Sequence, residues 1–150
     1  MEFIEPKEKI MYKIRTITIK DYDEIVNLWK NTEGIGSNDY DDSKKRIKIF
    51  LERNPNSCFA AECDNKIIGT ILGANDGRRG IIYHLMVKPE YRKNGIAKKL
   101  LEKVEKRLKK DGIRRIYLFV LKKNKIGNKF WEDNGYVIRD FIKNRSKSLE

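Results

Sequence analysis

Histidine and cysteine are scarce in this 150-residue chain, and their scarcity excludes several kinds of site. One histidine and two cysteines without CxxC spacing do not provide the ligands of a usual zinc site, so no metal is expected. The absence of GxSxG and GxxxxGK sequences argues against a serine hydrolase and a nucleotide hydrolase. The chain also lacks a long uncharged apolar run, so a membrane span is not expected.

Negative charge is the minority charge of the chain. Lys and Arg total 34 against 22 Asp and Glu, which gives a net charge of +12 at pH 7. An excess of this size indicates an anionic partner or, equally, a heat-adapted surface rich in ion pairs. Hydrophobic residues make up 39% of the chain, a fraction too high for a disordered protein, so we expect a globular fold.

The two cysteines and the N-terminal residues bear on the compartment. Cys58 and Cys63 are five residues apart in one expected strand, so their side chains face opposite sides and cannot form a local disulfide. We therefore expect reduced thiols and a cytoplasmic location. The first residues carry acidic side chains and no apolar stretch of signal-peptide length. Residues 1–11 are expected to form a flexible tail and residues 12–150 a single domain.

Alternating and helical hydrophobic patterns predict an α/β domain. Asp64-Asn65 is the expected turn of an antiparallel hairpin, Ser43 the expected cap of the second helix, and Asp111-Gly112 the end of the strongest helix. The run 81–87 is apolar nearly throughout, as in a strand covered on both faces. The expected strands are 14–20, 57–63, 66–74, 81–87, 116–121 and 136–138, and the expected helices are 21–30, 43–54, 96–110 and 126–133.

The segment 81–121 is the architectural centre of the prediction. A strand, an amphipathic helix and a second apolar strand follow one another, so the two strands are expected to be parallel neighbours. The loop from Arg92 to Ala97 opens the helix, where unpaired N–H groups suit a diphosphate. Gly95 and Ala97 keep this loop narrow, and Lys93 and Lys98 add positive charge. From spacing alone, an ordinary helix start explains the loop equally well.

The string V-x-P-x-x-R-x-x-G-I-A, which stands from Val87 to Ala97, resembles the acetyl-CoA signature of the GNAT superfamily of N-acetyltransferases. NKIGNKFWEDNGYV, from Asn124, is similar to the second conserved block of that family. The resemblance runs from Tyr12 to the C-terminus. It implies a GNAT-like mixed, mostly antiparallel sheet with a splayed parallel central strand pair and flanking helices.

The resemblance also implies a set of residues that bind acetyl-CoA. The strand that ends at Val87 and the strand that ends near Leu121 would splay apart, and main-chain groups of the first would hold the pantetheine and the acetyl carbonyl. The loop before the helix 96–110 would receive the diphosphate. Asn124 matches a residue that contacts the cofactor arm, and Phe130 would pack near it. The residues expected to bind acetyl-CoA are Leu85, Met86, Val87, Arg92, Lys93, Asn94, Gly95, Ile96, Ala97, Lys98, Asn124 and Phe130.

The reaction that the family implies is direct acetyl transfer in a ternary complex to a primary amine of a small molecule, a protein lysine or a protein N-terminus. Two residues depart from the family pattern. Trp131 stands where many members carry a tyrosine that protonates the thiolate, and an indole N–H is no useful acid. Phe119 stands where relatives that acetylate N-termini carry a glutamate. The usual general acid and general base are therefore both missing.

Tyr83 is the expected substitute in catalysis, since simple alternation puts it on the same face as Leu85. A half-buried aromatic residue is the plainer explanation of Tyr83. The same alternation turns His84 to the opposite face, where we expect a packed, neutral ring. Glu62 is expected in solvent on the hairpin, with no role.

Two other functions remain open. The tail 139–150 has the weak pattern of one more short, final strand, and an uncovered strand edge invites pairing with a neighbouring subunit, so a homodimer is a further hypothesis. A catalytically weak CoA-binding module would explain the residues at Trp131 and Phe119. An RNA- or ribosome-associated protein would explain the basic surface, although the chain shows no aromatic RNA-binding signature and nucleic acid is a weak expectation.

Overall fold

The computed structural model describes residues 8–150, and these fall into two compact units, residues 8–119 and 120–150. Each unit is described by itself. Most of the predicted tail, residues 1–7, lies outside the described residues, and residues 8–12 carry no regular secondary structure.

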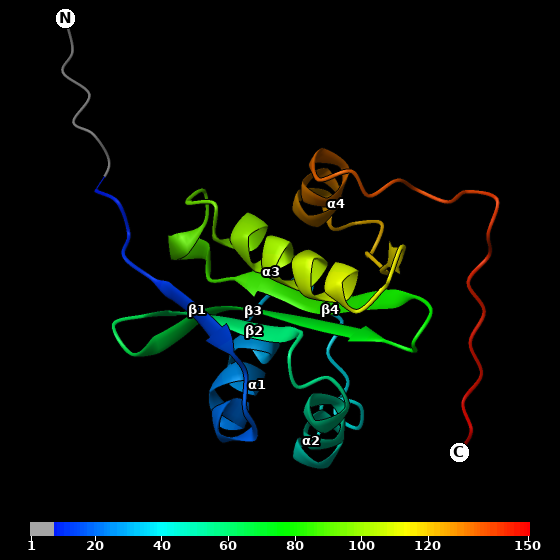
Figure 1. Cartoon of the computed structure of the whole chain (residues 1–150), viewed down its shortest axis with the longest axis horizontal. Helices are drawn as coiled ribbons and strands as arrows, with labels where there is room; N and C mark the ends of the chain where they lie inside the picture. The colour runs from blue at the N-terminus through cyan, green and yellow to red at the C-terminus, as the bar shows by residue number, and fades with distance from the viewer. Residues whose placement is uncertain (1–7) are drawn as a thin grey trace, which may run out of the picture. The chain divides into compact units, whose positions relative to one another are not determined.

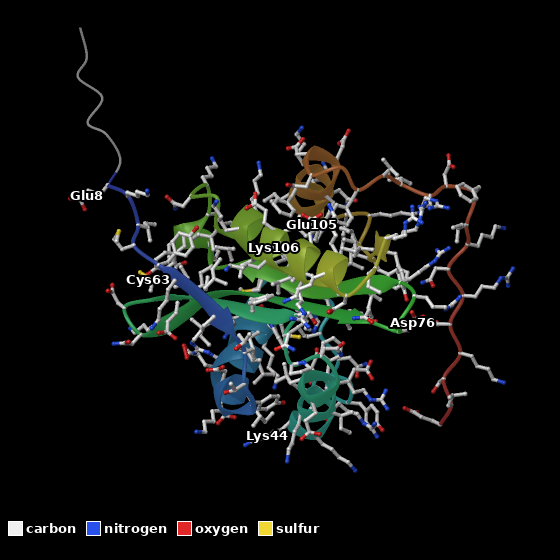
Figure 2. The ribbon with its side chains drawn as sticks, viewed as in Figure 1. Glu8, Lys44, Cys63, Asp76, Glu105 and Lys106 are labelled. Atoms are coloured by element: carbon white, nitrogen blue, oxygen red, sulfur yellow. The ribbon has the colours of Figure 1, made fainter. Side chains whose placement is uncertain are left out.

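The first unit contains a five-stranded sheet in the order β1-β2-β3-β4-β5. Its first three pairings are antiparallel and the last, between β4 and β5, is parallel, which confirms the predicted mixed sheet. The turns near Cys63 and at Asp76 lie at opposite ends of the sheet (Figure 2). The strands are β1 (Lys13–Thr16), β2 (Cys58–Cys63), β3 (Lys66–Asn75), β4 (Gly80–Val87) and β5 (Ile116–Tyr117).

Helices cover both faces of this sheet (Figure 1). The amphipathic helices α1 (Tyr22–Lys30) and α2 (Lys44–Arg53) lie on one face, and α3 (Ile96–Lys110) lies on the other. The Ser43 hydroxyl accepts a hydrogen bond from the Arg46 N–H, as expected of a helix cap. Two short 3₁₀ turns, Ile19–Asp21 and Pro89–Tyr91, precede α1 and α3.

Glycines allow α3 to lie close to the sheet. A Cβ added to Gly73 would lie 2.7 Å from both the Ser57 carbonyl oxygen and a Val104 methyl carbon. A Cβ on Gly80 would lie 2.8 Å from a Leu108 methyl carbon. Real Cβ atoms do not approach other atoms so closely, so α3 owes its depth to these two positions.

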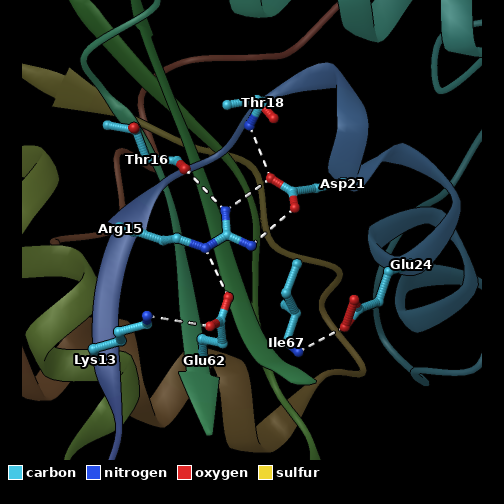
Figure 3. Close-up of polar contacts among 8 residues, drawn as sticks. All are labelled: Lys13, Arg15, Thr16, Thr18, Asp21, Glu24, Glu62 and Ile67. Carbon is cyan, nitrogen blue, oxygen red and sulfur yellow. Dashed lines mark hydrogen bonds and ion pairs between the residues drawn. The ribbon is translucent and has the colours of Figure 1, made fainter. Parts of the chain in front are cut away.

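Arg15 joins β1 to the start of α1 and to β2 (Figure 3). Its guanidinium donates to both carboxylate oxygens of Asp21, each at 2.9 Å, and its Nε lies 2.7 Å from the Glu62 carboxylate. The Glu62 side chain is only 12% exposed, so the expectation of a solvated residue without a role is wrong. Alternation along β2 does not reveal this contact because a register shift falls between Ala61 and Glu62.

This network moves two carboxyl pKa values in the same direction. Burial alone would raise the pKa of Asp21, but hydrogen bonds from Arg15 and from the Thr18 N–H bring it below its usual value. The hydrogen bond from Arg15 is the main cause of the lowered Glu62 pKa. Both carboxyl groups therefore stay ionised to a lower pH in the folded protein than in the unfolded chain.

Three strands differ from the prediction. β1 ends at Thr16, whereas a strand was expected through residue 20, and Ile19–Asp21 forms a 3₁₀ turn instead. β5 contains only Ile116–Tyr117, whereas the apolar run suggested a strand through residue 121. Phe119 and Leu121 are 64% and 48% exposed. Residues 136–138, predicted as a strand, carry no regular structure. An apolar run becomes a strand only where another strand takes its hydrogen bonds, and no described strand pairs with either segment.

The second unit contains residues 120–124, α4 (Lys125–Asp133) and the chain that follows the helix. Asn124 caps the helix, since its side-chain oxygen accepts a hydrogen bond from the Gly127 N–H at 2.9 Å. Trp131 packs edge-on against Phe130 and Tyr136. The final residues carry several exposed apolar side chains, at Val137, Ile138, Phe141 and Ile142.

Candidate functional site

The loop that opens α3 has a main chain fixed by unusual backbone angles. Lys93 and Gly95 both have positive φ values, 63° and 75°, and Gly95 is the residue that precedes the helix. Open space surrounds a Cβ built on Gly95, so its conformation, and no steric contact, favours glycine here.

Two side chains of this loop bond to its carbonyl groups. The Nε of Arg92 donates to the Val87 carbonyl at 3.1 Å. The side-chain amide of Asn94 donates to the carbonyls of Tyr91 and Arg92, at 2.9 and 3.0 Å. Arg92 and Asn94 therefore hold the loop from the carbonyl side, which leaves its N–H groups available.

Six consecutive amides, from Lys93 to Lys98, bond to no acceptor in the described part of the chain. The helical ladder begins only with Lys99, whose N–H donates to the Gly95 carbonyl at 3.0 Å. The positive end of the α3 dipole lies here, and the exposed Lys93 and Lys98 add two charges. A row of free N–H groups at a helix start suits a diphosphate.

No described strand pairs with the outer edge of β4 beyond Ile81. β5 pairs with β4 only at Gly80 and Ile81, so the parallel strands separate after two residues, as a splayed pair requires. The Lys88 N–H donates to the Ile68 carbonyl on β3. Because antiparallel residues alternate in direction, Leu85 and Val87 present their main-chain groups to the outer edge.

The same register directs the main-chain groups of Met86 toward Thr70 on β3, away from that edge. Met86 was expected to bind the pantetheine through its main chain. The register instead turns its main-chain groups toward β3, and its side chain is buried, 4% exposed.

A β-bulge interrupts β4 beside these residues. Leu72 pairs with Tyr83 and Thr70 pairs with Met86, so His84 and Leu85 together oppose the single residue Ile71. His84 adopts a φ of 48°, in the left-handed region that side chains rarely enter. The bulge breaks the alternation on which the predicted orientations of Tyr83 and His84 rested.

Both side chains face the layer formed by α1 and α2. The Tyr83 ring contacts Phe50 of α2 edge-on at 6.0 Å, and the His84 ring lies 4.4 Å from Trp29 of α1. The expectation that they face opposite ways is therefore wrong, because an inserted residue shifts every later side chain to the other face.

His84 is also more than a packed ring. Its Nε2 lies 2.9 Å from a carboxylate oxygen of Asp42, in a pair whose side chains are each 11% exposed. The Thr70 hydroxyl donates to the His84 carbonyl and accepts from the Trp29 indole, both at 2.9 Å. Asp42 was not foreseen, because 42 residues separate it from His84 and no local pattern joins them.

Tyr83 is 41% exposed. Burial raises its pKa above the usual value, and the nearby Tyr117 and Asp41 act in the same direction. The phenol therefore keeps its proton at neutral pH.

Asn124 and Phe130 belong to the second unit. The Asn124 side-chain oxygen is engaged as the cap of α4, and Phe130 is half-buried beside Trp131. Their role with acetyl-CoA stays a prediction. Among residues 8–150, no group of three His, Cys, Asp or Glu side chains is placed to hold a metal ion, and no helix is long and apolar enough to cross a membrane.

Comparison with known proteins agrees with this arrangement. The model of the acetyltransferase (GNAT) family matches residues 22–136. The acetyltransferase SG1711 of Sodalis glossinidius is 31% identical over 130 residues, which cover 87% of this chain and 90% of that protein. The chain therefore belongs to the GNAT acetyltransferase family.

Solved structures share the fold. The PaiA N-acetyltransferase of Thermoplasma acidophilum, in complex with coenzyme A, is 26% identical with a TM-score of 0.73, covering 84% of this chain and 89% of that one. An acetyltransferase of Clostridium acetobutylicum, solved with acetyl-CoA, is 23% identical with a TM-score of 0.72, covering 91% and 96%. The predicted family and fold class are confirmed.

Proposed function

We propose that this acetyltransferase moves the acetyl group of acetyl-CoA directly to a primary amine. The observation that carries the donor side is the row of six unbonded amides from Lys93 to Lys98 at the start of α3, together with the edge of β4 that no described strand pairs beyond Ile81. A diphosphate would accept from Lys93 to Lys98, and Leu85 and Val87 would bond to the pantetheine arm. The coenzyme A in the related PaiA structure supports this donor.

The charge of one loop supports a cationic acceptor. Residues 31–43 carry four carboxylates and no Lys or Arg, in a chain whose net charge is +12. A locally acidic surface on a basic protein attracts an ammonium group and not a phosphate. Its four acidic residues are Glu33, Asp39, Asp41 and Asp42.

The reaction balances as follows. The amine nitrogen attacks the thioester carbonyl, a C–N bond forms, and the C–S bond then breaks. The ammonium group gives up one proton to solvent before the attack and a second as the amide forms, and the CoA thiolate gains one. A main-chain N–H on the outer edge of β4 would stabilise the oxyanion, a contribution of about 2.7–4 kcal/mol for one such donor. Tyr83, which keeps its proton, would protonate the thiolate.

Calorimetric titration with acetyl-CoA tests the donor site. The wild type is expected to bind in the micromolar range, and Gly95→Glu to bind at least about 100-fold more weakly. The new side chain meets a φ of 75° and adds a negative charge beside the diphosphate. Binding by Gly95→Glu as tight as by wild type would contradict the assignment.

Gly77→Glu is the matched control. Gly77 lies in the β3–β4 turn with a φ of 88° and open space around it, so the change has the same strain and charge. It should bind acetyl-CoA as wild type does. The acceptor is then tested by CoA release with a diamine, an amino-acid amide and a lysine peptide, with mass spectrometry of the amine. A protein that binds acetyl-CoA and acetylates none of them contradicts the proposed transfer.

A further inference from the structure

A histidine–aspartate pair lies beside the proposed reaction site, and the two usual proton-transfer residues of the family are absent. We propose that His84 is the general base that removes the proton of the acceptor amine, and that Asp42 is the positioning residue that orients it. The inference rests on the proposed amine acetylation and adds the route of the proton.

The position of His84 along β4 is the first argument. His84 directly precedes Leu85, whose main-chain groups face the outer edge of β4 where the thioester would lie. Consecutive Cα atoms are about 3.8 Å apart, so His84 is attached to the chain one residue from the main-chain groups that would hold the thioester. His84 adopts a φ of 48° there, and strained angles of this kind concentrate at functional sites.

The face of the sheet is the second argument. α3, with the diphosphate loop, covers one face, and the His84 ring lies on the other, against Trp29 of α1. Asp42 comes from the acidic loop just before α2. An amine attracted by that loop would meet the thioester from the imidazole side, opposite to α3.

The hydrogen bonds of the pair define which nitrogen is basic. A carboxylate only accepts, so the Nε2 that lies 2.9 Å from Asp42 carries the hydrogen and Nδ1 keeps its lone pair. Nδ1 bonds to nothing among residues 8–150, yet no side-chain nitrogen in that range is both buried and without a partner. Nδ1 therefore reaches solvent, on the side of the ring nearer the β4 main chain.

Asp42 is itself held by four hydrogen bonds, one of which its own N–H donates to the Asn38 carbonyl at 2.8 Å. One carboxylate oxygen faces His84, and the other accepts from the Asn38 N–H at 3.1 Å. The Tyr22 hydroxyl of α1 donates to the Asp42 carbonyl at 2.7 Å. A residue so restrained fixes the tilt and the tautomer of the ring, as the carboxylate does in a nucleophile–histidine–carboxylate triad.

The proton balance is complete with groups of this chain and its substrates. As the C–N bond forms, the proton of the amine nitrogen moves to Nδ1, and the imidazolium is stabilised by the Asp42 carboxylate. The thiolate takes its proton from Tyr83. Solvent then returns a proton to Tyr83 and removes one from His84. Asp42 is the charged group that contacts the ring, and Tyr22 of α1 donates to the Asp42 carbonyl. Asp39 acts electrostatically on Tyr22, and Asp41 on Tyr83.

The test compares His84→Gln and Asp42→Asn with wild type, using the acceptor found in the amine panel. Glutamine can still donate to Asp42, so the fold should survive while the base is lost. We expect kcat to fall about 10²–10⁴-fold in His84→Gln and at least about 10-fold in Asp42→Asn, with acetyl-CoA affinity unchanged. Asp64→Asn, a charge-matched change of an exposed residue in the β2–β3 turn and outside the acidic loop, should keep the wild-type kcat.

Two readouts separate catalysis from a structural role. We expect kcat/KM of the wild type to fall at acidic pH and this fall to be absent in His84→Gln. Because the chain has one histidine, the ¹⁵N spectrum of the untagged protein reports a single imidazole and should show hydrogen on Nε2. Hydrogen on Nδ1, or a folded His84→Gln that keeps its kcat, overturns the role of His84 while amine acetylation stands. Failure of the wild type to acetylate any amine overturns both proposals, whatever the tautomer.

Discussion

The direction of the Tyr83 side chain depends on the bulge that begins at the next residue, His84. The bulge at His84 turns both rings toward the same helical layer, where Tyr83 meets Phe50. The phenol remains 41% exposed, so it can reach both a ligand and the packed interior. Because its pKa is raised, the phenol remains protonated well above neutral pH and can donate a proton there.

Tyr83→Phe removes this acid and little else, since the remaining ring can still pack on Phe50. We expect kcat to fall about 10–100-fold with the affinity for acetyl-CoA unchanged. Steady-state kinetics at about ten pH values between about pH 6 and pH 9 would measure this fall in kcat. If the variant keeps full activity, water or another group protonates the thiolate.

The elements that carry the proposed donor site were largely predictable. The helix after Gly95, its preceding loop and the parallel pairing of the flanking strands follow from local patterns and are present in the structure. The bulges were not predictable, because an inserted residue leaves no mark in an apolar run such as 81–87. The His84–Asp42 contact was equally hidden, since it joins two elements far apart in the sequence.

The close packing of α3 against the sheet can be tested directly with a larger side chain at a glycine. Gly73→Ala would place a methyl group 2.7 Å from the Ser57 carbonyl, which belongs to the rigid main chain. We expect a loss of about 1–3 kcal/mol in the free energy of unfolding. Urea denaturation measures it.

Gly36→Ala is the control for this change. Gly36 has open space around its Cβ position and no positive φ, so its alanine variant should unfold within about 0.5 kcal/mol of wild type. Equal stability of the two variants would mean that α3 can move outward without cost.

At the scale of the whole molecule, the Arg15 network ties acid stability to two carboxylates. Their pKa values are lowered in the folded state, so their contribution is complete above their unfolded values, near pH 4, and is lost as the pH falls through the folded values. Arg15→Met should therefore lower Tm by several degrees at pH 7.

The difference in Tm between wild type and Arg15→Met should shrink below about pH 4, where the carboxylates are protonated in both proteins. Thermal melts followed by circular dichroism from neutral to acidic pH would show it. A difference that stays constant across this range would mean that the guanidinium acts by packing alone. The homodimer expected from the weak final strand also stays a prediction; residues 136–150 form no strand and expose five apolar side chains.

The two free thiols lie at opposite ends of one strand, Cys58 at the start of β2 and Cys63 at its end. Burial raises the pKa of Cys58 to about 12 and is the main cause of the raised pKa of Cys63. Neither thiol forms a thiolate readily while it is covered. A thiol reagent therefore modifies each cysteine only when its end of β2 opens locally. The two modification rates would report separately how often β2 opens at Cys58 and at the hairpin end, near Cys63.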